Sequence, residues 1–317
     1  MKASNTPILF LVFNRPSTTK AVFRRIRQAK PAQLFVAADG PRCDREGEEE
    51  VCYKVRKIAT NIDWDCELKT LFRDKNLGCG RAVSEGIDWF FGHVEEGIIL
   101  EDDCLPDPSF FSYCQLQLER YRNDERVMHI AGVNFQAGIQ RGVGSYYFSK
   151  YPHVWGWATW RKAWKFYDFR MNDWMEYKNS KYFSHWSFNE DEANYWRFTF
   201  DRMFHQEIDT WDYQWLFTII KQNGLCLVPN INLVSNLGFN AQGTHTLVND
   251  KRFSKRKVFK YRIPDITAIK IADKDADDYT YRNVFNSPET GVKKKGSINF
   301  LLFRMLVKFI KVTKNGS

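Results

Sequence analysis

A short apolar stretch that ends in three consecutive acids constrains the fold of this chain more than any other feature of its sequence. Residues 97–106 read Gly-Ile-Ile-Leu-Glu-Asp-Asp-Cys-Leu-Pro. The unbroken apolar run predicts a buried strand, and the proline predicts that the strand stops there. Three adjacent carboxylates repel one another unless solvent, a helix N-terminus or a cation relieves them. The segment therefore predicts either a solvated turn or a metal-binding loop after a buried strand.

Strand and helix patterns alternate along the first hundred residues. Apolar runs predict strands at residues 8–13, 33–38 and 67–72, and the segments 16–30 and 45–59 between them predict helices. This alternation predicts an α/β fold with a mostly parallel central sheet flanked by helices. In such sheets ligands bind outside the carboxyl ends of the strands.

Polar residues follow the predicted strands at this edge. Arg15 comes after the first strand, Asp39 after the second, and Glu101 to Asp103 after the acidic strand. An arginine at such a place binds phosphate or stacks on a base, and an aspartate accepts hydrogen bonds from a base or a ribose. The alternatives are a solvated arginine and a turn residue in Asp39-Gly-Pro. Their common position favours a shared binding site.

A glycine-bearing turn precedes another predicted helix. Residues 76–81 read Asn-Leu-Gly-Cys-Gly-Arg, and apolar residues at helical spacing follow. Free N–H groups at a helix start bind anions, and Arg81 in the first turn would add a positive charge. The turn matches neither the Walker nor the dinucleotide-binding pattern.

Four tryptophans fall within residues 155–164. Trp157, Trp160 and Trp164 have helical spacing, which predicts a buried stripe on a helix. The alternative is that Trp155 or Trp157 forms a platform for a sugar ring.

The remaining pattern continues the α/β theme. Helices are predicted at residues 108–121 and 191–206, and strands at 126–131 and 224–229. Asp212 begins a further predicted helix beside Trp211 and Trp215. It is either a helix cap or a carboxylate held ionised in a site that excludes water. A loop over residues 236–246 carries His245.

Cysteine usage and the N-terminus indicate a cytoplasmic protein. The seven cysteines are odd in number, widely spread and without a C-x-x-C pair, which argues against a disulfide framework. The early apolar run is only six residues long, so we expect no secretory signal there.

The net charge of +9 is concentrated near the C-terminus. Residues 1–249 hold 30 basic and 31 acidic residues, whereas residues 250–317 hold 17 and 7. A neutral body argues against a nucleic-acid-binding module. We expect a catalytic domain at 1–249, a basic extension at 250–292 and a basic amphipathic helix at 293–317. The apolar runs of that helix are too short to span a bilayer, so we expect the helix either to lie on the inner face of the membrane or to pack on protein.

Six motifs together resemble inverting nucleotide-sugar glycosyltransferases of the Rossmann-like GT-A fold. More closely, the chain is similar to bacterial relatives of N-acetylglucosaminyltransferase I over residues 5–247. The motifs are Phe13-Asn14-Arg15-Pro16, Ala38-Asp39-Gly40-Pro41-Arg42, Leu100-Glu101-Asp102-Asp103, Trp157-Ala158-Thr159-Trp160, Trp211-Asp212-Tyr213-Gln214-Trp215 and residues 236–245.

The resemblance implies a role for each matching residue. Asp103 matches the acid that holds manganese, and Glu101 and Asp102 match acids that contact the ribose and the sugar. Arg15 and Asp39 match positions that face the diphosphate and the uracil. Asp212 matches the catalytic base. Arg81 and His245 match, more loosely, a basic residue near the phosphates and a residue of a mobile loop that closes over the donor.

These implications agree with elementary chemistry. A departing diphosphate needs positive charge, which oxygen-bound Mn²⁺ or Mg²⁺ supplies together with an arginine. One carboxylate base with direct displacement predicts inversion at the anomeric carbon. We therefore expect a metal-dependent hexosyl- or N-acetylhexosaminyltransferase that uses a nucleotide sugar, UDP-linked by resemblance, and acts on a glycan or lipid-linked glycan in bacterial cell-envelope polysaccharide biosynthesis.

Two other functions remain open at this point. One is a sugar-nucleotidyltransferase, although its usual glycine-rich, lysine-bearing loop is missing after the first strand. The other is a non-enzymatic basic module that binds nucleic acid or membrane.

Overall fold

A large mixed sheet forms the centre of the computed structural model, which describes residues 6–238, 256–261 and 270–286. The strands are β1 (Ile8–Val12), β2 (Gln33–Ala38), β3 (Glu67–Phe72), β4 (Glu96–Glu101), β5 (Cys104–Pro106), β6 (Val127–Ala131), β7 (Tyr146–Ser149), β8 (Trp157–Trp160), β9 (Leu225–Pro229) and β10 (Val234–Asn236). The helices are α1 (Pro16–Ala29), α2 (Glu48–Ala59), α3 (Cys79–His93), α4 (Ser109–Tyr121), α5 (Arg161–Trp164), α6 (Trp174–Tyr177), α7 (Lys181–Trp186), α8 (Glu190–Phe204), α9 (Asp212–Lys221), α10 (Lys274–Thr280) and the π-helix η1 (Tyr281–Phe285).

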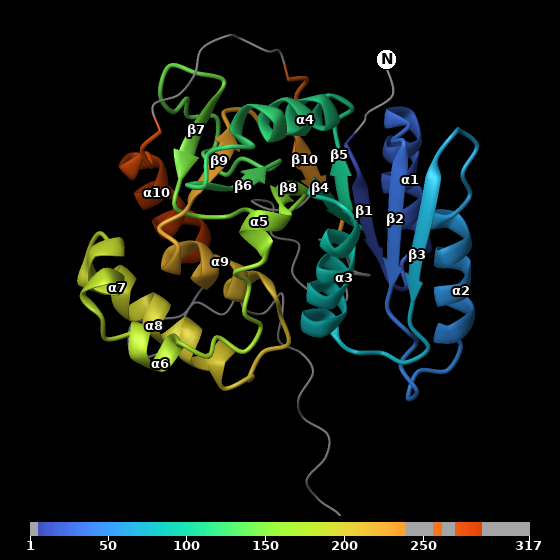
Figure 1. The fold of residues 1–317 in the computed structure, drawn as a ribbon, viewed down its shortest axis with the longest axis horizontal. Helices are drawn as coiled ribbons and strands as arrows, with labels where there is room; N and C mark the ends of the chain where they lie inside the picture. Colours follow the sequence, from blue (N-terminus) through green and yellow to red (C-terminus); the bar gives the residue numbers. More distant parts are fainter. Residues whose placement is uncertain (1–5, 239–255, 262–269, 287–317) are drawn as a thin grey trace, which may run out of the picture.

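Eight strands make up this sheet in the order β3-β2-β1-β4-β8-β6-β9-β7, and Figure 1 shows it running across the molecule from β3 to β7. Strands β3, β2, β1 and β4 are mutually parallel, and β6 is parallel to β9. Strand β8 is antiparallel to both of its neighbours, and β7 is antiparallel to β9. The fold is therefore of the expected α/β class, with a mostly parallel, Rossmann-like central sheet flanked by helices. Strands β10 and β5 form a separate antiparallel pair.

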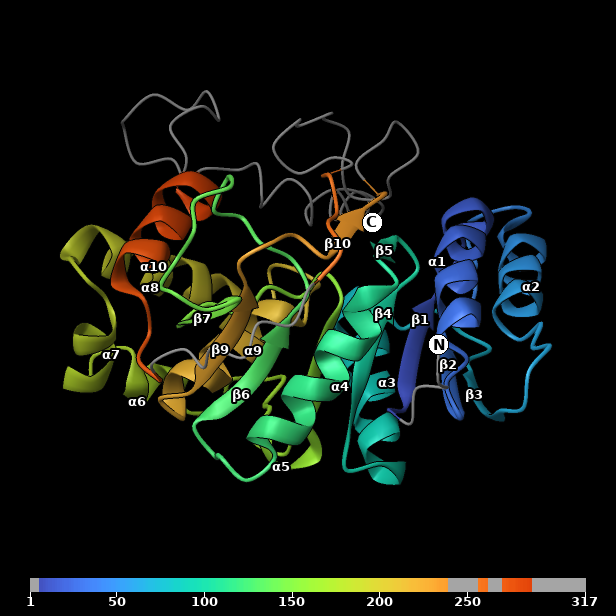
Figure 2. The same ribbon diagram turned by 90° about the horizontal axis from the view of Figure 1, so that it is seen from above.

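Helices cover both faces of the sheet because its strands are apolar on both sides. Alternate residues of β1 divide between two cores: Ile8 and Phe10 pack with α1, α2 and α4, whereas Leu9 and Leu11 pack with α3, α5 and α9. A third core joins α6, α7 and α8 to the outer face of α9. Figure 2 shows α6, α7 and α8 grouped at the opposite end of the molecule from α1 and α2.

The tryptophan-rich segment is a strand followed by a single helical turn, so the predicted helical stripe is wrong. Trp157 and Trp160 begin and end β8, and a separation of three positions along extended chain places their side chains on opposite faces. Trp157 accordingly packs in the core with α3 and α9, and Trp160 packs in the core with α4. The prediction of burial is confirmed for both.

The chain after the sheet returns to pack on the body. Asp277 in α10 accepts hydrogen bonds from the Ser149 hydroxyl and from the Lys150 backbone N–H at the end of β7. Tyr281 in η1 joins the core of α8 and α9. This packing involves residues 270–286, whereas the amphipathic helix predicted at 293–317 lies outside the described residues.

Two further observations bear on the sequence predictions. All seven cysteines are described, and each is a free thiol. No helix within the described ranges combines the length and the apolar character needed to cross a membrane.

Candidate active site

Three strands of the sheet end side by side and deliver the predicted loops to one edge. Val12 at the end of β1 is paired with Ala38 of β2, and Leu11 is paired with Glu101 of β4. The residues that follow these positions therefore leave the sheet together, as the parallel arrangement requires. Arg15, Asp39 and the acids 101–103 begin from this common edge.

The acids after β4 are held by an arginine from the loop after β1. Arg15 Nη1 donates to Asp102 Oδ1 at 3.1 Å and to Asp103 Oδ2 at 2.6 Å. Asp102 Oδ2 also accepts a hydrogen bond from the Phe13 backbone N–H at 3.3 Å. The side chains of Asp102 and Asp103 are only 7% and 13% exposed, so this ion pair lies away from bulk water. Sequence reasoning placed these three residues in one site, and the structure brings them together.

Burial of the acidic cluster disfavours the charged forms of its members. Burial, together with the charges of Asp103 and Asp102, raises the pKa of Glu101 to about 8. Burial raises the pKa of Asp102 to about 6, although the charge of Arg15 opposes the shift. Three acids thus share one guanidinium, and a further cation at this place would favour their charged forms.

Asp212 lies within electrostatic reach of this cluster. Its charge contributes to the raised pKa of Glu101, and burial raises the pKa of Asp212 itself. The Thr210 hydroxyl donates to Asp212 Oδ1 and opposes that shift. The Cys79 thiol lies among the same groups, since the charges of Glu101, Asp209 and Asp212 add to the effect of burial in raising its pKa. The ends of β1 and β4 and the starts of α3 and α9 therefore meet at one place.

The tryptophans around Asp212 are core residues that fix the start of α9. Trp211 and Trp215 are buried and pack on Trp157, with ring centroids 5.6 Å and 5.9 Å away. Trp157 is fully buried, so it offers no exposed platform for a sugar ring. Trp155 is half-buried and packs edge-on against Phe135.

Asp39 is a buried anchor for the glycine-bearing turn. Its two oxygens accept hydrogen bonds from the Leu77 N–H at 3.0 Å and 3.1 Å and from Asn76 Nδ2 at 2.8 Å. Burial raises its pKa, and the Leu77 bond opposes that shift. Asp39 therefore joins the loop after β2 to the loop before α3, and its proposed contact with a base stays a prediction.

The start of α3 is occupied by a carboxylate of the protein itself. Asp209 accepts hydrogen bonds from the backbone N–H groups of Cys79 and Gly80, at 2.7 Å and 2.8 Å. The expectation that these N–H groups are free for a ligand anion is therefore wrong. Arg81 follows on an exposed position of the same turn, and its role at the phosphates stays a prediction. His245 lies outside the described residues.

Asp103 lies against the segment that follows β10. Leu237 N–H donates to the Asp103 carbonyl at 2.7 Å, and a Cβ on Gly238 would lie 2.3 Å from Asp103 Oδ2. The chain after β10 thus passes directly over this carboxylate, and a side chain at position 238 would require the Asp103 carboxylate to move. Among the described residues, no group of three or more His, Cys, Asp and Glu side chains is arranged to hold a metal. Magnesium-type ions are commonly held by one or two carboxylates and complete their shell with phosphate oxygens and water, so the hard oxygens of this loop fit such an ion.

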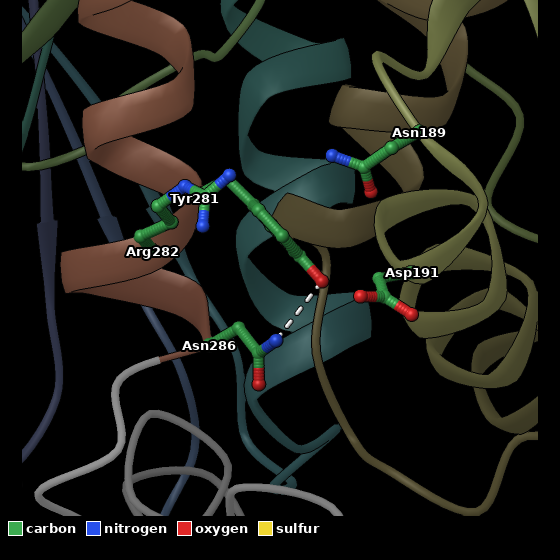
Figure 3. Close-up of a pocket in the computed structure, with 5 residues that line it drawn as sticks. All are labelled: Asn189, Asp191, Tyr281, Arg282 and Asn286. Atoms are coloured by element: carbon green, nitrogen blue, oxygen red, sulfur yellow. Dashed lines mark hydrogen bonds between the residues drawn. The ribbon is translucent and has the colours of Figure 1, made fainter.

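A hollow of about 250 Å³ elsewhere on the molecule does not involve these residues (Figure 3). It lies between the start of α8 and η1, and on the η1 side Asn286 Nδ2 donates to the Tyr281 hydroxyl at 3.0 Å. Its lining residues are Asn189, Asp191, Tyr281, Arg282 and Asn286.

No local sequence pattern marks Asp209, Thr210 or Gly238 as part of the site. Asp209 is 129 residues from Gly80 in the chain, and only the three-dimensional structure shows that they meet. Gly238 lies within the segment 236–245 that carried the resemblance, but its contact with Asp103 follows from packing alone.

The fold is an α/β fold with a Rossmann-like sheet, and one edge of this sheet gathers an arginine and several acids. No protein-family model matches the chain, and no curated protein matches its sequence. Among solved structures, it is similar to a UDP-glucose pyrophosphorylase complexed with UDP-glucose, with 12% identity and a TM-score of 0.29 over 50% of this chain and 70% of that one. It is also similar to the apo form of mouse xyloside xylosyltransferase 1, with 12% identity and a TM-score of 0.33 over 68% and 81% of the two chains.

Proposed function

We propose that this protein is a metal-dependent inverting glycosyltransferase that transfers a sugar from a nucleoside-diphosphate donor to a hydroxyl group. One observation carries the proposal. At the carboxyl edge of the sheet, Arg15 from the loop after β1 contacts two of the three acids that follow β4. The half-buried Asp212 at the start of α9 lies within electrostatic reach of these acids. This edge is where open α/β sheets bind their ligands.

Asp212 is the proposed base. Its carboxylate takes the proton of the acceptor hydroxyl as that oxygen forms a bond with the anomeric carbon, and the bond from this carbon to the donor phosphate breaks with its electron pair. Attack from the face opposite the leaving group inverts the configuration. Burial raises the pKa of Asp212, which makes its carboxylate a stronger base than an exposed one.

Arg15 is the proposed partner of the leaving diphosphate. Its guanidinium already lies between Asp102 and Asp103, and the charges of these two acids raise its pKa although burial alone would lower it. Its charge is therefore permanent and its position is fixed before a donor arrives. A bound Mn²⁺ or Mg²⁺ held by Asp103 would add positive charge at the same place.

The remaining predictions belong to this proposal without a structural test. They are UDP as the nucleotide, a cell-envelope glycan or lipid-linked glycan as the acceptor, a bacterial cytoplasmic location, and contact of residues 293–317 with the inner face of the membrane.

The loop after β1 offers a reason to prefer transfer of the sugar over nucleotidyl transfer. Only Phe13, Asn14 and Arg15 connect β1 to α1, a loop without glycine or lysine.

The first test is a panel of nucleotide sugars, measured for manganese-dependent thermal stabilisation and for slow hydrolysis. With the donor that stabilises the protein most, we expect Asp212→Asn to have the donor affinity of the wild type. Its rate of sugar transfer should fall by about 10²–10⁴-fold, because the general base is removed. The matched control is Asp63→Asn, which changes an exposed carboxylate paired with Arg27 and should leave transfer unchanged. A fully active Asp212→Asn enzyme would refute the assignment of the base, and a panel without any stabilising donor would refute the proposed function.

A further inference from the structure

The carboxylate of Asp209 joins the start of α3 to the segment that leads into α9. Its Oδ2 accepts the Cys79 N–H at 2.7 Å and its Oδ1 accepts the Gly80 N–H at 2.8 Å. Hydrogen bonds from two backbone N–H groups to one carboxylate are charge-assisted, and the positive end of the helix dipole strengthens them. This bidentate contact connects two segments that are 129 residues apart.

The glycines on either side of Cys79 are the residues that make this contact possible. Gly78 has a φ of +82°, and a Cβ there would lie 2.5 Å from Asp209 Oδ2. A Cβ on Gly80 would lie 2.8 Å from Asp209 Oδ1 and 2.8 Å from the Thr210 carbonyl oxygen. Larger residues at these positions would push the Asp209 segment away from α3. The glycine-bearing turn thus serves a contact within the protein.

The same segment is held at each residue from Asp209 to Asp212. The Tyr167 hydroxyl donates to the Trp211 carbonyl at 3.0 Å, and Gln214 Nε2 donates to the Thr210 carbonyl at 2.9 Å. The Thr210 hydroxyl donates to Asp212 Oδ1. Asp209 begins this series, so its anchor on α3 sets where Thr210 and then Asp212 stand relative to the acids after β4.

We propose that Asp209 is a positioning residue, which orients Asp212 for catalysis by fastening the chain before α9 to the start of α3. The inference rests on the proposed function, because Asp212 is the base only in that account. Asp209 itself lies on an exposed position, and its two oxygens accept the Cys79 and Gly80 N–H groups. It acts on the reaction through the placement of Asp212.

The kinetic test compares Asp209→Ala and Asp209→Asn with the wild type. A misplacement of about 1 Å at a reacting group costs about 10²-fold in rate, so we expect Asp209→Ala to lower kcat by about that factor while the KM for the donor stays within about twofold. Asp209→Asn keeps one acceptor oxygen for an N–H group, and we expect it to recover part of the loss. The control is Asp273→Ala, which removes a carboxylate that caps α10 through the Ala276 N–H and should leave kcat unchanged. A kcat equal to the wild type in Asp209→Ala, or a lowered KM that would mark Asp209 as a competitor of the donor, would overturn the proposal.

Amide hydrogen exchange tests the tether without any activity measurement. We expect faster exchange at residues 79–80 and 209–212 in Asp209→Ala, with the helical amides in the second half of α9 unchanged. Unchanged exchange at 209–212 would refute the tether. A wild-type enzyme that neither binds nor consumes any nucleotide sugar would instead refute the proposed function, so the two failures are distinguishable.

Discussion

Arg15 is the residue around which the proposed cation site is built. The guanidinium stands between two carboxylates that are largely shielded from water, and it supplies one positive charge to a cluster of three acids. Removing one partner of a buried pair leaves the other partner's charge without compensation, which is far costlier than the loss of an exposed ion pair. The Arg15 side chain is 24% exposed, which reduces this cost but does not remove it.

We therefore expect Arg15→Met to lower the free energy of unfolding by about 2 kcal/mol when divalent ions are absent. Added Mn²⁺ should restore part of this loss, because a divalent cation near Asp103 replaces the missing charge. Chemical denaturation with and without Mn²⁺ measures both effects. Arg24→Met provides the control, since Arg24 lies on an exposed position of α1, the helix that follows Arg15. Equal stabilities of the two variants, with no response to Mn²⁺, would contradict this account of Arg15.

At the scale of elements, the placement of α9 against β6 and β8 decides where Asp212 stands. His129 in β6 stacks on Trp157 of β8, with ring centroids 5.0 Å apart, and its Nδ1 accepts the Trp215 indole N–H at 3.2 Å. Its Nε2 lies 3.2 Å from the His153 carbonyl, so a neutral ring with the proton on Nε2 satisfies both partners. A charged ring would lose the bond from Trp215.

Burial lowers the pKa of His129 to about 3, which makes stability depend on pH. An unfolded histidine titrates near pH 6.5, so between about pH 6.5 and pH 3 the unfolded chain binds a proton that the native protein does not. Stability contributed by this residue is complete above pH 6.5 and falls as the pH drops. When the pH falls from 7 to 5, we expect the free energy of unfolding to fall by about 2 kcal/mol less in His129→Gln than in the wild type.

Denaturation curves at the two pH values measure this difference. Comparison with the wild type cancels the contributions of other titrating groups, such as His153, whose pKa burial also lowers to about 3. His205→Gln, at an exposed position, serves as the control and should keep the wild-type pH dependence. If His129→Gln also kept the wild-type pH dependence of stability, the description of His129 as buried and neutral would be wrong.

Elements with long, regular patterns could be predicted from the sequence, and elements that depend on distant partners could not. The apolar runs of β1, β2 and β4 and the helices between them appear within a few residues of their predicted bounds. The segment 157–164 misled because tryptophans three residues apart fit either one face of a helix or both faces of a strand. Residues 157–160 form a strand because they pair with β4 and β6, and these two partners are distant in the sequence.

At the scale of the whole molecule, the sheet order explains which site residues could be predicted. Parallel strands place their carboxyl ends together, and this rule was sufficient to group Arg15 with the acids after β4. It could not show that Asp209 closes the start of α3 or that Gly238 covers Asp103, because neither contact follows from the position of a strand. The roles of His245 and of the basic segment 293–317 stay predictions of the sequence.

The proposed function depends on a cation that the acids at 101–103 hold and that neutralises a departing nucleoside diphosphate. Calorimetric titration with UDP, or with the diphosphate that the donor panel selects, tests this dependence when it is run with and without Mn²⁺ on the wild type and on Asp103→Asn. We predict that Mn²⁺ tightens binding to the wild type and that Asp103→Asn loses this gain, by about 10–100-fold in affinity. Equal affinities in all four titrations would contradict the account.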